Sequence, residues 1–467
     1  MAVTKSLKLP KVVLFRSRGR RNSIVDDKHQ QRLEDRVGKV GILGRYHGPS
    51  HHIESEYTVS NQVLGTGCSG AVWLATQRGQ SQRKYAVKAL SLASLQPSQL
   101  ERLKAEVENF LCMDHPHITR LHDVYESETH MHLVMECLDG GELFDRVAAK
   151  GRFSEAETAE AMYQMLLAVN YIHSHGIVHR DIKLENFLYD KQGGTHLKLI
   201  DFGFSKMWDP SVEMHGGIGT MAYMAPEVLT DSYTSQCDMW SLGVISFILM
   251  AGYMPFAGAN MLANIQSRKY SWKPEKWNGV SQDAMNFMKC LMDVDPCSRL
   301  TAQSALLHPW LALRRPTMER PDAGVVEALR GFATLPAFRR CCLEMIAWVL
   351  SNEERSRVRQ YFIGMDANRQ GTITLEELRA AMVALGISDD EVMKAFSMLD
   401  TNHDNEIHYS DFLAAMVSTK IDLSESLLDD AFRRFDTDGS GDITAQDLRT
   451  VLGDTFEGKR VEALLKE

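Results

Sequence analysis

A short polar stretch holds the side chains that phosphoryl transfer requires. Residues 179–186 (HRDIKLEN) contain a carboxylate at Asp181, an ammonium group at Lys183 and an amide at Asn186. A carboxylate can orient a substrate hydroxyl and accept its proton, a lysine can hold the moving phosphate, and an amide oxygen can bind a metal ion. Further along the chain, Asp201 begins the triplet DFG and offers a second metal ligand. The two motifs in this order predict magnesium-dependent phosphoryl transfer rather than a polar loop before a hairpin.

A glycine-rich segment upstream predicts a loop that covers phosphate groups. Gly65, Gly67 and Gly70 can bring backbone N–H groups close to phosphate oxygens, because no Cβ stands in the way. Dinucleotide-binding folds use the same glycine spacing, but they place a helix directly after it. Here the strand-like run 71–75 follows, and it includes Val72, which we expect to cover the adenine face. The segment therefore predicts a hairpin over a nucleotide.

Lys88 ends a strand-like run and would hold the phosphates of that nucleotide. A buried ammonium group needs an anionic partner, because its charge is costly to remove from water. The helical stretch 100–113 offers two candidates, Glu106 and Glu108. Glu106 lies four residues before Phe110, so both side chains project from one helix face. The residues alone leave the choice between the two carboxylates open.

Together, these motifs resemble those of the eukaryotic-type protein kinases. The resemblance implies a bilobal domain that uses ATP and Mg²⁺, and it favours Glu106 as the partner of Lys88. Lys183 and Thr220 are typical of the serine/threonine class. The implied ATP-binding residues are Leu64, Gly65, Gly67, Gly70, Val72, Ala86, Lys88, Met135, Glu136, Leu138 and Leu188. The implied catalytic residues are Asp181, Lys183, Asn186, Lys88 and Glu106, and the implied magnesium ligands are Asn186 and Asp201.

The same resemblance implies a peptide groove flanked by Glu142, Glu185 and Thr220. The two carboxylates suit an arginine upstream of the target residue, through charge-assisted pairing. Arg20 lies three residues before Ser23, and this gives the N-terminal segment the form of such a target.

The resemblance also identifies residues that would support the catalytic loop. Asp238 is expected to anchor that loop, and Arg299 is expected to pair with Glu227. The usual phosphorylatable position of the activation segment is Gly216 here, so Glu213 is the candidate that would supply the anion instead.

The C-terminal part of the chain repeats one pattern three times. Twelve-residue loops begin at Asp366, Asp400 and Asp436, and apolar residues recur at the same offsets around each loop. Oxygen ligands at fixed loop positions between two helices are typical of EF-hand calcium sites. The expected ligands are Asp366, Asn368, Gln370, Thr372 and Glu377 in the first loop, Asp400, Asn402, Asp404, Glu406 and Asp411 in the second, and Asp436, Asp438, Ser440, Asp442 and Asp447 in the third.

The three loops differ in the residue that closes them. Glu377 can bind calcium through both carboxylate oxygens, whereas Asp411 and Asp447 are one methylene shorter, which weakens calcium binding or favours Mg²⁺. Asn405 also replaces the turn glycine of the second loop. EF-hands normally pair, and the repeat would start a fourth loop just past the last residue, 467. The fourth loop is either natively absent or cut off.

A junction at residues 312–350 separates the two regions. The apolar residues Phe338, Cys342, Met345 and Val349 fall on one helix face, and Arg339 and Arg340 lie off that face. Such a basic amphipathic helix serves either as plain packing or as an autoinhibitory segment of the calmodulin-target type. The calcium loops that follow favour the second interpretation.

This order of parts resembles the calcium-dependent protein kinases of plants and protists. It implies a multidomain α+β protein with a basic, disordered extension (1–56), a bilobal kinase domain (57–311), an autoinhibitory junction (312–350) and an all-α EF-hand domain (351–467). The implied cofactors are ATP, Mg²⁺ and Ca²⁺. The implied partners are protein substrates with Arg or Lys upstream of the target, and an intramolecular contact joins the EF-hands to the junction helix. Without Ca²⁺, the junction helix around Arg339 and Arg340 is expected either to lie near the carboxylates of the groove or to brace the kinase in an inactive arrangement.

Composition limits the setting in which the protein acts. The net charge is −9, but residues 1–50 carry 12 Lys/Arg against 4 Asp/Glu, whereas residues 351–467 carry 13 against 24. Eight scattered cysteines favour a reducing compartment, and no apolar run is long enough for a signal peptide or a membrane span. Residue 2 is Ala, so the myristoylation pattern is absent. We therefore expect a cytoplasmic protein without a nucleic-acid partner, with weak membrane attraction through its basic N-terminus.

Two other functions fit parts of the pattern. A pseudokinase scaffold with a calcium sensor is disfavoured because Lys88, Glu106, Asp181, Asn186 and Asp201 are all present. A calcium-insensitive serine/threonine kinase with structural EF-hands stays open, because the second and third loops are imperfect.

Overall fold

The structure is a computed structural model that describes residues 44–67, 70–93, 95–203, 205–207, 214, 219–312, 321–417, 419–457 and 459–466. The predictions on Arg20, Ser23, Glu213 and Gly216 lie outside the described residues.

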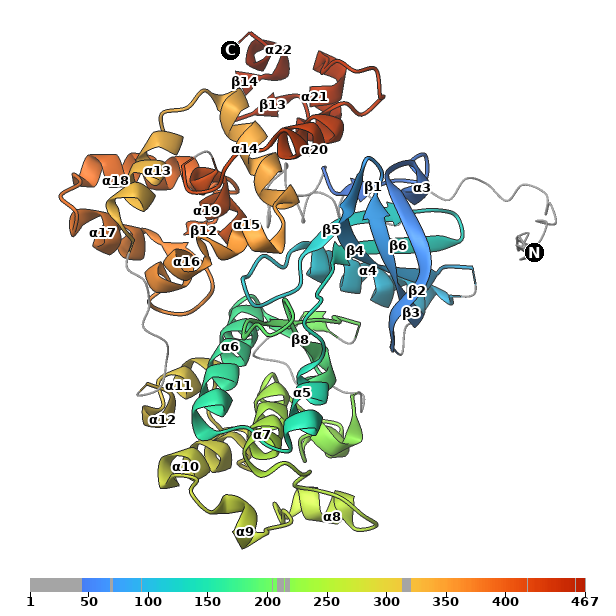
Figure 1. The fold of residues 1–467 in the computed structure, drawn as a ribbon, viewed down its shortest axis with the longest axis vertical. Coiled ribbons are helices and arrows are strands. Elements are labelled where there is room, and N and C mark those ends of the chain that lie inside the picture. The colour runs from blue at the N-terminus through green and yellow to red at the C-terminus, as the bar shows by residue number, and fades with distance from the viewer. Residues whose placement is uncertain are drawn as a thin grey trace.

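A six-stranded sheet in the order β1-β5-β6-β4-β3-β2 forms the first lobe (Figure 1). Its elements are β1 (Tyr46–His47), α3 (Ile53–Glu56), β2 (Tyr57–Gly67), β3 (Gly70–Gln77), β4 (Gln80–Ser91), α4 (Pro97–Leu111), β5 (Leu121–Glu126) and β6 (His130–Glu136). Successive side chains of a strand point to opposite faces of a sheet. In β4, Tyr85 and Val87 therefore join a small apolar cluster on one face, and Lys88 points to the other.

The ordered lobe begins before residue 57, which differs from the expected disordered extension. Strand β1 pairs in parallel with β5, and helix α3 precedes β2 directly. Arg45 is fully buried, and its guanidinium donates to the carbonyl oxygens of Leu121 at 3.0 Å and Leu111 at 2.8 Å. The part of the chain from residue 44 to 56 is therefore built into the sheet lobe.

A helical second lobe follows. Its helices are α5 (Leu143–Lys150), α6 (Glu155–Ser174), α7 (Gln236–Ala251), α8 (Met261–Gln266), α9 (Pro274–Trp277), α10 (Gln282–Leu291), α11 (Ala302–Leu306) and α12 (Pro309–Ala312). Its short strands are β7 (Ile177–Val178), β8 (Phe187–Tyr189), β9 (Leu197–Leu199) and β10 (Lys206–Met207). Helix α6 begins at a capping box, in which Ser154 accepts from Glu157 N and the Glu157 side chain reaches back. Helices α6 and α7 are buried along most of their length and form the base of the catalytic loop.

A third, mainly helical region follows. It comprises α13 (Ala323–Phe332), α14 (Ala337–Val349), α15 (Asn352–Ser356), α16 (Arg359–Met365), β11 (Ile373–Thr374), α17 (Leu375–Val383), α18 (Asp389–Leu399), β12 (Glu406–Ile407), α19 (Tyr409–Met416), α20 (Glu425–Phe435), α21 (Ala445–Leu452), β13 (Thr455–Phe456), β14 (Lys459–Arg460) and α22 (Val461–Leu464). One apolar core joins residues of α13 and α14 to residues of the helix–loop–helix units. We call this region, from α13 to α22, the regulatory region.

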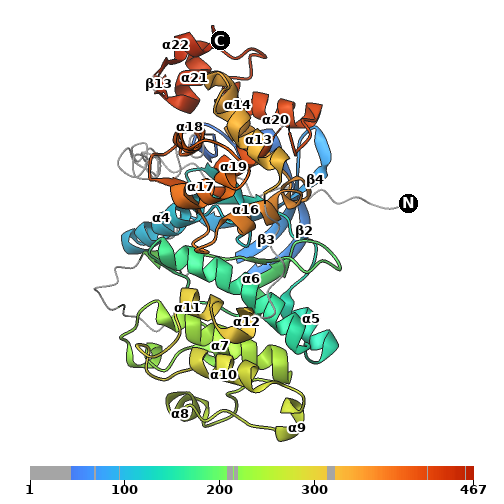
Figure 2. The same ribbon diagram turned by 90° about the vertical axis from the view of Figure 1, so that its left-hand side faces the viewer.

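The first two helix–loop–helix units pair through their loops. Ile373 of β11 faces Ile407 of β12 in an antiparallel pair. The third unit is followed by the hairpin β13–β14 and by α22. The regulatory region lies beside the sheet lobe and over α6, as the two perpendicular views agree (Figure 2). In the described part of the chain, no helix has the length and apolar character needed to cross a membrane.

Candidate functional site

The predicted catalytic residues of the 179–186 loop lie together around Asp181. Lys183 Nζ lies 2.6 Å from Asp181 Oδ2. Thr220 donates to Asp181 Oδ1 from its hydroxyl at 2.9 Å and from its backbone N–H at 3.0 Å. Asn186 Nδ2 donates to the Asp181 carbonyl at 2.7 Å, so its amide oxygen is the atom left to face a cation. A carboxylate held by so many donors keeps one orientation, which is what a group that positions a hydroxyl needs.

The loop is fixed from below by Asp238 of α7. Its two carboxylate oxygens accept from His179 N at 2.9 Å and from Arg180 N at 2.8 Å. Arg180 has a positive φ of 69°, so these bonds hold the loop in a conformation that costs free energy. The predicted anchoring role of Asp238 is confirmed. The predicted Arg299–Glu227 pair is confirmed as well, with nitrogen–oxygen distances of 2.5 and 3.0 Å.

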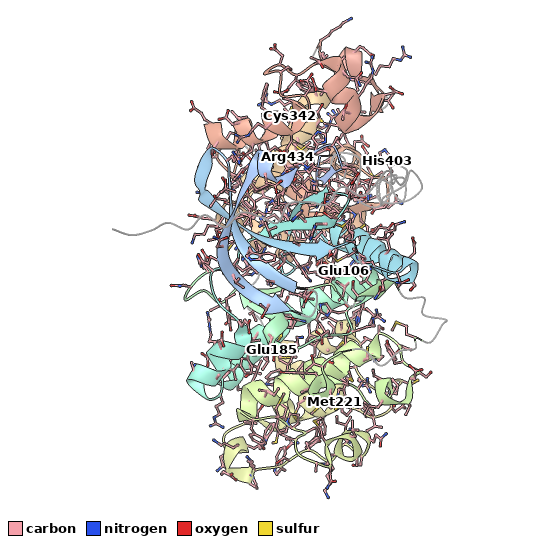
Figure 3. The ribbon with its side chains drawn as sticks, turned by 90° about the vertical axis from the view of Figure 1, so that its right-hand side faces the viewer. Glu106, Glu185, Met221, Cys342, His403 and Arg434 are labelled. Atoms are coloured by element: carbon pink, nitrogen blue, oxygen red, sulfur yellow. The ribbon has the colours of Figure 1, made fainter. Side chains whose placement is uncertain are left out.

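The predicted Lys88–Glu106 ion pair is not formed in this structure. Lys88 Nζ instead lies 2.9 Å from Asp201 Oδ1, which also accepts from Gly203 N at 3.3 Å. Glu106 lies on α4 beside the sheet (Figure 3), and no ion pair among the described residues joins it to Lys88. Burial raises the pKa of Glu106, and the charge of Lys88 opposes that rise. The ammonium group has paired with the nearer carboxylate, and Glu106 acts on it only over a longer distance.

The predicted ATP-binding residues come from the sheet lobe and from β8. Leu64, Gly65 and Gly67 lie in β2, Gly70 and Val72 in β3, Ala86 and Lys88 in β4, Met135 and Glu136 in β6, and Leu188 in β8, with Leu138 just past β6. The register aligns Val72 with Lys88 and Ala86 with Met135. The segment that follows β6 links the two lobes, and we call residues 136–139 the hinge.

Two carboxylates of the predicted peptide groove, Glu142 and Glu185, lie at the catalytic loop. Glu142 forms an isolated β-bridge with Leu188, which places it beside strand β8. Partial burial and the carboxylates of Asp145 and Glu185 raise the pKa of Glu142, and Lys183 opposes the rise. Glu185 Oε2 is buried, and burial together with the Glu185 carboxylate raises the pKa of Tyr223, so these two side chains are neighbours. The predicted pair Glu142 and Glu185 therefore shares one electrostatic environment that favours a cationic ligand.

The first calcium loop has its predicted ligands folded toward one another. Asp366 accepts from the backbone N–H groups of Gln370 at 3.0 Å and Gly371 at 2.9 Å. Glu377 accepts from Asn368 N at 2.8 Å through Oε1 and from Thr374 N at 2.9 Å through Oε2. Thr372 lies at the buried start of the β11 pair. Burial raises the pKa of Asp366 to about 7, so this carboxyl needs a cation to ionise fully. The oxygen-rich donor set fits Ca²⁺.

The second loop contains a histidine that sequence reasoning missed. Asp404, Glu406 and His408 bring their ligating atoms within 4.8 Å of one another, and His408 Nε2 lies 2.8 Å from Asp404 Oδ2. Asn402 Nδ2 donates to the same Asp404 oxygen at 2.8 Å. His408 lies in the sequence between the predicted ligands Glu406 and Asp411, and this position could have identified it as a further candidate ligand.

The residues that open and close this second loop are held by the backbone. Asp400 accepts from Asp404 N and Asn405 N, each at 3.1 Å. The closing residue Asp411 is buried, which raises its pKa to about 7, and it accepts from His408 N at 2.9 Å. Asp411 is one methylene shorter than Glu377, so bidentate binding is harder and the donor set fits Ca²⁺ less well than that of the first loop.

The third loop gathers carboxylates near the surface. Asp436, Asp438 and Asp447 bring ligating oxygens within 4.8 Å of one another. Ser440 N donates to Asp436 and to Asp438, each at 2.9 Å. Asp442, the fourth predicted acidic ligand of this loop, is exposed and does not belong to this group of three carboxylates. This arrangement fits a hard divalent cation.

The junction helix α14 packs against the EF-hands and not in the peptide groove. Met345 and Val349 are buried in the shared core, and Phe338 and Cys342 are partly buried against it. Arg340 pairs with Glu457 of the regulatory region and not with the groove carboxylates, so the contact expected in the absence of Ca²⁺ stays a prediction. Figure 3 shows Cys342 and Glu185 at separate heights of the molecule, with the sheet lobe between.

The other side of the junction helix contacts the kinase lobes. Arg120 Nη1 donates to Ala347 O at 2.6 Å. The centroid of the Trp348 ring lies 3.7 Å from the guanidinium carbon of Arg45 and 4.5 Å from that of Arg120. Helix α14 is therefore buried between the EF-hands and the sheet lobe, which the single apolar face in the sequence did not indicate.

The EF-hands themselves contact the kinase lobes through ion pairs and backbone bonds. Arg434 pairs with Asp123 at 2.8 Å, and Arg83 pairs with Asp430 at 2.7 Å. In the first loop, Arg369 O accepts from an α6 side chain, Asn170, at 2.6 Å. These contacts are between residues far apart in sequence, and no local pattern predicts them.

Comparisons with known proteins agree with this arrangement. The family described as "Protein kinase domain" matches residues 58–311, "EF-hand domain pair" matches residues 355–417, and "EF-hand domain" matches residues 427–457. Calcium-dependent protein kinase 3 of Plasmodium berghei (strain Anka) is 33% identical over 410 residues, which cover 86% of this chain and 73% of the relative. Calcium-dependent protein kinase 17 of Arabidopsis thaliana is 34% identical over 461 residues, which cover 95% and 86%.

A protein kinase domain and EF-hands in one chain define a protein kinase with a built-in calcium sensor. The chain belongs to the calcium-dependent protein kinases. It is a calcium-regulated serine/threonine protein kinase, and ATP, a divalent metal and Ca²⁺ are its cofactors.

Proposed function

We propose that this kinase transfers the γ-phosphate of ATP to serine or threonine in proteins that carry an arginine or lysine upstream of the target. Asp181 orients the target hydroxyl and accepts its proton, and Lys183 neutralises the phosphate as it moves. Thr220 keeps the Asp181 carboxylate in place through its two hydrogen bonds. Asn186 and Asp201 would hold magnesium, which would supply positive charge beside the phosphates.

Lys88 and Glu106 serve the nucleotide in this proposal. Lys88 binds the α- and β-phosphates, and Glu106 pairs with it once Asp201 is engaged by the metal. The bond of 2.9 Å between Lys88 and Asp201 supports this exchange, because a cation at Asp201 would repel the ammonium group toward the next carboxylate.

The substrate preference rests on one observation. Glu185 Oε2 is buried, and the Glu185 carboxylate is close enough to Glu142 to help raise the pKa of Glu142. Two neighbouring carboxylates repel one another, and a substrate guanidinium would offset that repulsion through charge-assisted hydrogen bonds. This supports arginine three residues before the target.

Calcium would act through the junction helix. Calcium, when bound, would draw the loop ligands together and expose apolar surface for α14. The burial of Met345 and Val349 among the EF-hands supports the view that the structure represents this calcium-favoured arrangement, in which the groove is free of α14. The kinase acts in the cytoplasm, and its basic N-terminal segment adds a weak attraction to anionic membranes.

One assay tests the proposal. A synthetic peptide with the sequence of residues 20–24 at its centre is phosphorylated with Mg-ATP in calcium and in chelator. We expect phosphate transfer that rises with calcium. No transfer in either condition would point to a scaffold without activity, and equal transfer in both would point to structural EF-hands.

A further inference from the structure

Glu136 is the first residue of the hinge, and its side chain has charged partners on two sides. Lys198 Nζ of β9 lies 2.6 Å from Glu136 Oε1, and Arg355 Nη2 of α15 lies 2.5 Å from Glu136 Oε2. The side chains are 1%, 4% and 2% exposed for Lys198, Glu136 and Arg355, respectively. Arg355 belongs to the regulatory region, whereas the other two residues belong to the kinase lobes.

The same carboxylate also fixes the backbone of the hinge. Arg120 N donates to Glu136 Oε1 at 2.7 Å, and Glu136 N donates to Arg120 O at 3.0 Å. Strand β6 therefore ends where Arg120, the residue before β5, Lys198 of β9 and Arg355 of α15 each bond to Glu136. Strand β9 is followed closely by Asp201. The Lys198–Glu136 pair therefore connects the hinge, where adenine is expected to bind, to the segment that carries the expected magnesium ligand Asp201.

Removing one charge from such a buried group leaves another without its partner. If the regulatory region moves away, Arg355 leaves with it, and Glu136 Oε2 loses the donor that it has in the docked arrangement. Breaking a buried pair on one side is costly, because a carboxylate is left uncompensated. The remaining carboxylate would rotate toward Lys198 or toward solvent, and the hinge backbone would shift with it.

We propose that Arg355 is a positioning residue for nucleotide binding: it reaches from the regulatory region to Glu136 and makes the affinity for ATP depend on docking of the EF-hands. The inference rests on the proposed function in one respect, that the hinge backbone at Glu136 and Leu138 binds adenine. It goes beyond that function by naming the residue through which calcium binding to the EF-hands changes the affinity for ATP.

The full chain with Arg355→Met tests this inference in saturating calcium. We expect the KM for ATP to rise about tenfold. This change is smaller than the full free-energy cost of removing one partner of a buried charge pair. The KM for the peptide should change less than twofold, because Arg355 contacts the hinge and not the groove residues Glu142 and Glu185. Arg355→Lys keeps the positive charge and should recover part of the loss.

Arg434→Met is the matched control. Arg434 also belongs to the regulatory region, and it forms a similarly buried pair with Asp123, at 2.8 and 3.0 Å, away from the hinge. Arg434→Met removes this one contact and leaves the Arg355–Glu136 pair in place, so in saturating calcium its KM for ATP should stay near that of the unaltered protein. An equal rise in both variants would overturn the inference, because it would show general loosening of the interface. No rise in either variant would overturn it as well.

A binding measurement separates this inference from the proposed function. Adenosine lacks phosphates and does not chelate calcium, so its affinity for the full chain can be measured by calorimetry in calcium and in chelator. The unaltered protein should bind adenosine about tenfold more tightly in calcium, and Arg355→Met and Glu136→Gln should lose that difference. Equal affinities in the unaltered protein would overturn the inference. If adenosine and ATP bind to none of the proteins, the proposed function itself has failed.

Discussion

The guanidinium of Arg340 in the junction helix pairs with the carboxylate of Glu457, in the turn between β13 and β14. This pair joins α14 to the part of the regulatory region that lies farthest along the chain. Arg340 is buried, whereas its neighbour Arg339 is more accessible to solvent. The two arginines that the sequence grouped as one basic feature therefore have different environments.

Arg340→Met should raise the calcium concentration needed for half-maximal activity. The variant leaves the Glu457 carboxylate without its partner and so weakens the hold of the EF-hands on α14. The readout is peptide phosphorylation across a calcium titration. Arg339→Met, at the more accessible neighbouring position, is the control and should leave the titration unchanged. An unchanged midpoint for Arg340→Met would show that the pair does not contribute to the switch.

Asp181→Asn should keep ATP affinity and lose turnover. The amide can still accept from Thr220, but it cannot take the hydroxyl proton, so kcat should fall by about 10²- to 10⁴-fold. ATP binding by calorimetry and the melting temperature check that the site is intact. Activity close to that of the unaltered protein would remove the catalytic assignment.

A peptide with arginine three residues before its serine should be preferred over the same peptide with alanine. The expected ratio of kcat/KM is about tenfold or more, since a charge-assisted pair with a partly buried carboxylate contributes about 1.5–3 kcal/mol. Glu142→Gln together with Glu185→Gln should reduce the ratio toward one. If the ratio stays the same in the double variant, the arginine is bound elsewhere.

Glu377→Gln should weaken the calcium response. Glu377 Oε1 and Oε2 both face the first loop, and the amide removes the negative charge that a bidentate ligand provides. Moving a kinase from about 1% to 99% active requires about 5.5 kcal/mol of differential binding, so one loop is not expected to suffice alone. The calcium midpoint of activity is the measurement, and Glu376→Gln, at the exposed preceding position, is the control. Equal midpoints for the two variants would exclude the first loop from the switch.

Gly371→Ala should loosen the first loop from the kinase. Gly371 has a φ of +87°, and an added Cβ would come within 2.5 Å of Tyr171 Cδ2 and 2.8 Å of His115 Cδ2. Gly439→Ala is the control, since it has a similar φ of +69° and open space around it. We expect Gly371→Ala to lower the melting temperature more than the control does. An equal loss would mean that backbone strain, and not the contact, explains the effect.

The sequence by itself determined the parts whose chemistry is local. Asp181, Lys183 and Asn186 lie close together in one short loop, and each calcium loop is a single continuous segment, so spacing alone was enough to locate these loops, although it missed His408 in the second calcium loop. The apolar face of Phe338, Cys342, Met345 and Val349 was also readable, because a helix repeats its faces at a fixed period.

Only the tertiary structure decided which distant charges meet. Lys88 pairs with Asp201 and not with Glu106, Arg340 pairs with Glu457 and not with the groove, and Arg355 reaches Glu136 across 219 positions of the chain. Each choice depends on which carboxylate the packed lobes bring within reach of a cation. That distance is a property of the folded chain, because the energy of a buried charge depends on its neighbours in space and not on its neighbours in sequence.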